Sequence, residues 1–98
     1  MIKTYIARTR ESVWRRIGDE TIVMLAPESR LFTLNETATM LWDAADGATP
    51  LEEIVERTLC AACEIDFPIA YSDALSVVER LAEKGALLVS DSPFTNAA

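Results

Sequence analysis

The 98-residue sequence has no histidine, and it has only 3 glycines and 2 cysteines. A structural zinc site takes four Cys or His ligands, which this chain alone does not supply. The sequence also lacks a glycine-rich phosphate loop and a nucleophile with an evident general base. These absences argue against an enzyme, and we expect neither a metal nor another cofactor.

Basic residues are scarce, because 9 Lys and Arg stand against 16 Asp and Glu and give a net charge of −7. A surface of this sign repels phosphate backbones, so we expect no nucleic-acid partner. No apolar run approaches the roughly eighteen residues of a membrane span, and the N-terminus lacks the apolar stretch of a signal peptide. The sequence therefore predicts a cytoplasmic protein with no membrane partner.

Apolar residues make up 50% of the chain and charged residues 26%, which is typical of a folded globular domain. The length predicts one domain over residues 1–98. Residues 1–12 show no sustained period, and we interpret them as a loose N-terminal arm in which Lys3 to Ala7 can form a short strand. We expect residues 91–98 to be a frayed tail.

Three runs rich in β-forming residues follow the arm: VWRRIG from Val13, ETIVML from Glu20 and RLFTL from Arg30. Gly18-Asp19 suits a tight hairpin between the first two runs, and proline and serine in Ala26–Ser29 mark a second turn. Because short connections join neighbouring strands, the pattern predicts a three-stranded antiparallel meander.

Helical periodicity then appears three times. Asn35 is a preferred N-cap residue for the first segment, and Gly47 is placed to end it. Thr49 begins a capping-box pattern at the start of the second segment. The third segment opens near Asp66 and ends at Gly85, after which ALLV forms a short strand or an extended segment. The whole pattern predicts an α+β fold that is winged-helix-like, with the meander followed by a three-helix bundle.

Cys60 and Cys63 are three residues apart in CAAC. The pair falls at the end of a predicted helix, without the preceding strand that a thioredoxin-like motif needs. We interpret both as small helical residues. A reversible disulfide and a site shared between two chains are the alternatives.

The stretches LFTLNETATMLWDAADGATPLEEIVE and DALSVVERLAEKGALL resemble the PqqD family, the small proteins of pyrroloquinoline quinone (PQQ) biosynthesis. The resemblance spans roughly residues 13–90. The matching features are the strand end at Leu34-Asn35, Thr37 early in the helix, the Asp46-Gly47 stop, the Glu53-Ile54 pair, and Leu81 followed by Gly85-Ala86-Leu87-Leu88.

The resemblance implies a RiPP recognition element, a module that binds the leader of a ribosomally made precursor peptide and presents it to a tailoring enzyme. In the PQQ pathway that enzyme is a radical SAM protein. The expected partners are therefore a precursor peptide and a radical SAM peptide-modifying enzyme, and another modified-peptide pathway is the alternative. Whether the protein is a monomer or a dimer stays open.

In this family the leader is said to add as an extra strand beside the third strand, packing against the third helix. The edge of a sheet offers unpaired N–H and C=O groups that suit such an addition. We expect the strand Arg30 to Leu34 to be that edge, held beside a groove by its tight junction with the next helix at Asn35. Alternation assigns Phe32 and Leu34 to the core and Leu31 and Thr33 to the other face.

Helical spacing places Asp73, Ser76, Val77 and Arg80 in one strip on the third segment, which we interpret as the wall of the groove. Arg80 is positioned to pair with a leader carboxylate and Asp73 with a leader Lys or Arg. The alternative is that all four are solvated surface residues. The predicted peptide-binding residues are Arg30, Leu31, Phe32, Thr33, Leu34, Asn35, Asp73, Ser76, Val77 and Arg80.

A DNA-binding winged helix shares the predicted outline and is a competing hypothesis. It needs Lys or Arg on the exposed face of a recognition helix. The third helical segment instead carries Asp73, Glu79 and Glu83 against Arg80 and Lys84. The charge pattern therefore favours peptide binding over DNA binding.

Overall fold

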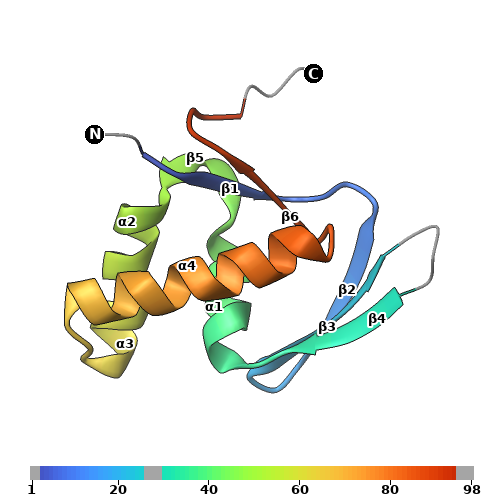
Figure 1. Ribbon diagram of the computed structural model, residues 1–98. Helices are drawn as coiled ribbons and strands as arrows, with labels where there is room; N and C mark the ends of the chain where they lie inside the picture. The colour runs from blue at the N-terminus through green and yellow to red at the C-terminus, as the bar shows by residue number, and fades with distance from the viewer. Residues whose placement is uncertain (1–2, 26–29, 95–98) are drawn as a thin grey trace.

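Two antiparallel sheets and three helical segments are joined in the computed structural model, which describes residues 3–25 and 30–94 (Figure 1). The strands are β1 (Tyr5–Arg8), β2 (Ser12–Ile17), β3 (Glu20–Leu25), β4 (Arg30–Leu34), β5 (Asp46–Pro50) and β6 (Leu87–Ser90). The helices are α1 (Glu36–Ala44), a run composed of α2 (Leu51–Val55), the π-helical turn η1 (Glu56–Cys60) and α3 (Ala61–Cys63), and then α4 (Phe67–Glu83).

The predicted meander is present, with the strand order β2-β3-β4 and both pairings antiparallel. Trp14, Val23 and Phe32 lie opposite one another on the face that the helices cover. Val23 is fully buried, whereas its neighbour Met24 is exposed, so burial alternates along β3 as the sequence pattern predicted. The α+β class and the three-stranded meander are thus confirmed, and the winged-helix-like arrangement stays a prediction. The turn predicted at Ala26–Ser29 lies outside the described residues.

A second sheet, with the order β5-β1-β6, was not predicted. The short strand expected within Lys3 to Ala7 is present as β1, Tyr5–Arg8. The prediction of a loose arm over residues 1–12 is wrong for this segment, because β1 is the middle strand of the sheet and Ile6 is fully buried. Tyr5 pairs with Pro50 on one side and with Ser90 on the other. Since both partner strands are distant in sequence, no local pattern signals this pairing. The ALLV segment does form a strand, β6.

The beginning of the predicted frayed tail is attached to the fold. The Phe94 N–H donates a hydrogen bond to the Gly47 carbonyl at 2.8 Å, and the Phe94 side chain packs against Gly47. The prediction of fraying is therefore wrong at Phe94, and the last four residues of the predicted tail lie outside the described part of the chain.

The helix starts were predicted with mixed success. Asn35 caps α1, because its side-chain oxygen accepts a hydrogen bond from the Ala38 N–H at 2.9 Å. The capping box at Thr49 is wrong, since the Thr49 hydroxyl donates to the Asp46 carboxylate at 2.9 Å and α2 has no side-chain cap. The N-cap position of α2 is Pro50, so Thr49 lies one residue before the position that the box required. The third helix, α4, has the predicted extent.

The predicted stop of the first helix at Gly47 is also wrong in position. α1 ends at Ala44, and Gly47 lies within β5 with a φ of +76°, a conformation that glycine adopts at little cost. A Cβ at this position would lie 3.1 Å from the Phe94 Cβ, so the glycine also permits a close contact with Phe94.

One core joins both sheets to the helices. Trp42 and Leu41 from α1 are fully buried, together with Ile6 from β1 and Leu51 from α2. The inner stripe of α4 consists of Ala70, Ala74, Val78 and Leu81. Its small residues let α4 pack closely on α1 and α2, and Figure 1 shows α4 crossing the molecule from the α3 end towards the β2-β3-β4 sheet. This packing sets α4 beside β4.

Candidate functional site

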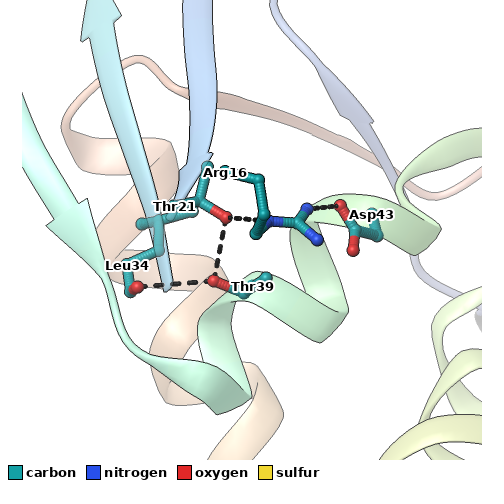
Figure 2. Close-up of polar contacts among 5 residues, drawn as sticks. All are labelled: Arg16, Thr21, Leu34, Thr39 and Asp43. Atoms are coloured by element: carbon teal, nitrogen blue, oxygen red, sulfur yellow. Dashed lines mark hydrogen bonds and ion pairs between the residues drawn. The ribbon is translucent and has the colours of Figure 1, made fainter. Parts of the chain in front are cut away.

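A chain of hydrogen bonds fixes the end of β4 against α1 (Figure 2). The Thr39 hydroxyl donates to the Leu34 carbonyl at 3.3 Å, and its oxygen lies 2.9 Å from the Thr21 hydroxyl oxygen. Because the single Thr39 hydroxyl proton is used for Leu34, Thr21 must be the donor to Thr39. Both threonines are buried, so these bonds do not compete with water.

Arg16 extends this chain to β2. Its Nε donates to the Thr21 hydroxyl oxygen at 3.1 Å, and its guanidinium pairs with the Asp43 carboxylate on α1. The Arg16 guanidinium also lies 5.7 Å from the ring centroid of Trp14. The meander is therefore joined to α1 through side chains from β2 and β3 as well as through the Asn35 junction.

One edge of β4 is open. Among residues 3–25 and 30–94, β4 pairs only with β3. The N-terminal strand β1 is occupied by β5 and β6 and does not cover this edge. Leu31 and Thr33 are exposed, Phe32 is half-buried and Leu34 is buried, which is the alternation that the sequence predicted.

A pocket of about 200 Å³ lies where β4 and the first turn of α1 meet α4. Ligand pockets for small molecules commonly have volumes of about 300–1,000 Å³, so this one is closer to the size of a single large side chain. It is lined by Phe32, Thr33, Leu34, Asn35, Ala38, Val77, Arg80, Leu81 and Lys84.

The pocket combines apolar walls with two cations. Leu34, Ala38 and Val77 supply apolar surface. Arg80 and Lys84 add positive charge, and the Lys84 ammonium lies 5.2 Å from the ring centroid of Phe32. Within the described residues, no carboxylate forms an ion pair with either cation. In a chain of net charge −7, the pocket thus places local positive charge beside apolar surface, an arrangement that suits an anionic group next to an apolar one.

Six of the ten predicted site residues line this pocket: Phe32, Thr33, Leu34, Asn35, Val77 and Arg80. Arg30 and Leu31 belong to β4, and Asp73 and Ser76 belong to α4; all four are exposed and none is among the lining residues. The structure therefore does not bring Asp73 to the pocket, and the binding role of all ten residues stays a prediction.

Three lining residues were not predicted: Ala38, Leu81 and Lys84. Lys84 follows Arg80 by one helical turn, so the same i, i+4 spacing that selected Arg80 also indicates Lys84. Leu81 was assigned only to the buried stripe. Ala38 belongs to α1, and no sequence signal relates it to α4.

The described part of the chain gives little indication of a membrane span or a metal site. None of its helices is long and apolar enough to cross a membrane. Within residues 3–25 and 30–94, no group of three or more His, Cys, Asp or Glu side chains is arranged to hold a metal ion. Cys60 is half-buried and is not in a disulfide.

Comparisons with known proteins give two matches. The sequence profile of the family described as "Coenzyme PQQ synthesis protein D (PqqD)" matches residues 21–87. A solved structure described as "TbiB1 in Complex with the TbiA(beta) Leader Peptide" is similar, with a TM-score of 0.75 and 25% sequence identity over 83% of this chain and 93% of the other. No curated protein matches the sequence.

Proposed function

Because the chain belongs to the PqqD family, we propose that it binds the leader of a ribosomally made precursor peptide and presents it to a tailoring enzyme. TbiB1, which resembles it in structure, was solved with a leader peptide bound. Members of this family are non-catalytic peptide-binding domains, so the prediction that the chain is not an enzyme is confirmed by its family.

The open edge of β4 carries the proposal. A leader that adds to this edge forms hydrogen bonds with the unpaired N–H and C=O groups of β4. Every second side chain of the leader then faces the pocket between β4 and α4. Thr39 donates a hydrogen bond to the Leu34 carbonyl, and Asn35 accepts one from the Ala38 N–H. These bonds hold the edge in place before the peptide arrives, which lowers the cost of ordering the site.

The expected affinity suits a carrier that releases its cargo. About four backbone hydrogen bonds contribute about 0.5–1.5 kcal/mol each, and two or three apolar anchors contribute about 1.5–3 kcal/mol each. Ordering a disordered leader costs about 2–5 kcal/mol or more. The balance spans a wide range and is compatible with a Kd of about 1 μM, near −8 kcal/mol.

The enzyme that receives the peptide follows from the pathway. In PQQ biosynthesis it is a radical SAM protein, and in another modified-peptide pathway it is a different maturase. A neighbouring gene for a radical SAM enzyme, together with a short precursor gene that encodes a Glu and Tyr pair, supports PQQ. A different neighbouring maturase supports the alternative.

Titration of ¹⁵N-labelled protein with its cognate precursor peptide tests the binding site. The amide resonances of residues 30–35 and those of α4 around Val77 and Arg80 are expected to shift. β2, the other edge of the same sheet, is the internal control. Shifts confined to β2, or the absence of shifts at β4, refute binding at this edge.

Strand addition itself is tested with N-methylated precursor peptides. Methylation of a peptide nitrogen that faces β4 removes a hydrogen-bond donor and leaves every side chain intact, so we expect weaker binding. Methylation of the next nitrogen, which faces away, is the matched control. Equal affinity of the two peptides contradicts strand addition.

A further inference from the structure

The two ends of the pocket beside β4 differ in charge. Its cationic end lies towards Phe32, because the Lys84 ammonium sits 5.2 Å from the Phe32 ring. The other end of the pocket lies towards Leu34, and Ala38 follows in the first turn of α1. Val77 precedes Lys84 by two turns of α4, which assigns it to this end. Figure 1 shows β4 and α4 running in roughly opposite directions, which agrees with this order.

The two ends of the pocket are two helical turns apart along α4, a distance spanned by about two to three residues of a strand. Lys84 follows Val77 by seven residues, a rise of about 10 Å along a helix. Phe32 and Leu34 are separated by about 7 Å along a strand and point to the same face. A peptide strand beside β4 thus places every second side chain opposite one end of the pocket or the other.

On the proposed function, we infer that the bound leader segment contains an apolar residue followed two positions later by Asp or Glu. The apolar side chain lies beside Leu34, and the carboxylate lies beside Phe32 within reach of Arg80 and Lys84. This order, from N- to C-terminus, holds for an antiparallel addition, and antiparallel pairing is slightly more stable per residue than parallel pairing.

The outer face of the sheet specifies a further position. Leu31, Met24 and Val13 lie opposite one another across the three strands, and their side chains are 60%, 43% and 70% exposed. The peptide residue opposite Leu31 extends this row and gains a cross-strand apolar contact. The recognised segment is therefore apolar, any residue, acidic, apolar.

The charges of the protein make the acidic position selective. The protein as a whole repels an acidic peptide, so a carboxylate is favoured only where cations without a carboxylate partner are near. Arg80 and Lys84 are such a pair within the described residues, and one lies a helical turn after the other. Arg80 and Lys84 repel a leader that has Lys or Arg at this position.

The probe for this inference is a capped, fluorescein-labelled decapeptide, Ser-Thr-Thr-Leu-Thr-Glu-Val-Thr-Ser-Gly, whose Kd is measured by fluorescence anisotropy. We expect it to bind about tenfold more tightly than its glutamine counterpart. We also expect it to bind more tightly than the peptide in which Leu and Glu are exchanged. Arg80→Glu should abolish the preference for glutamate, and a peptide with Lys in place of Glu should recover binding to that variant.

Arg15→Glu is the matched control, because Arg15 is exposed on β2 and the change in net charge is the same. It should leave the preference for glutamate unchanged. An equal loss in both variants shows that only net charge matters and overturns the inference. Tighter binding of the exchanged peptide overturns the proposed order.

The amide shifts of β4 separate this inference from the proposed function. If the glutamate and glutamine peptides shift β4 equally and bind equally, the motif is wrong while binding at β4 stands. If neither peptide shifts β4 but the cognate precursor does, the motif is again wrong and the binding site stands. If the cognate precursor also leaves β4 unshifted, the proposed function fails.

Discussion

Replacing Thr39 by valine tests whether the buried hydroxyl chain holds β4 to α1. The substitution keeps the shape of the side chain and removes two hydrogen bonds, one from Thr21 at 2.9 Å and one to the Leu34 carbonyl at 3.3 Å. At about 0.5–1.5 kcal/mol each, the free energy of unfolding should fall by about 1–3 kcal/mol. This is a large share of the roughly 5–15 kcal/mol that stabilises a typical domain.

The double-mutant cycle with Thr21→Val gives the decisive measurement. Each single substitution leaves a buried partner without its hydrogen bond, whereas the double substitution removes both hydroxyls together. The double variant should therefore lose about 1 kcal/mol less than the sum of the single losses. Urea denaturation followed by circular dichroism measures all four proteins. Strictly additive losses would refute a direct Thr21–Thr39 hydrogen bond.

Three further predictions concern the rest of the fold. Gly47→Ala should destabilise the protein more than Gly18→Ala, because both glycines have positive φ but only a Cβ at Gly47 meets the Phe94 side chain; equal losses in urea denaturation would show that this contact does not matter. Hydrogen bonds from backbone N–H groups, first that of Ala48, lower the pKa of the Asp46 carboxyl below its ordinary value of 3.8. The ionised Asp46 therefore stabilises the fold fully above pH 3.8, and this contribution is lost as the pH falls through the lowered pKa. The stability difference between the wild type and Asp46→Ala should accordingly narrow in acid, and a constant difference contradicts this account. Leu34→Ala should cost about 2–5 kcal/mol because Leu34 is only 3% exposed, and a loss below about 1 kcal/mol in the same assay contradicts its place in the core.

Features that depend on neighbouring residues were predictable from the sequence. The Asn35 cap, the extent of α4 and the alternation along β4 arise from interactions within a few residues, so their patterns are visible in the chain itself. The wrong expectations at Thr49 and Gly47 were also local. They failed because β5 pairs with β1, a contact between segments about forty residues apart that overrides the helix-end pattern.

The sequence by itself determined the meander, the three helical segments and a strand that leads directly into a capped helix. Only the tertiary structure placed β1 in the centre of a second sheet and left the edge of β4 open. It also decided that Lys84, rather than Asp73, reaches the pocket beside Phe32. Periodicity indicates which face of an element is buried, and capping residues indicate where a helix begins. The partner that covers the buried face is set by packing between distant segments.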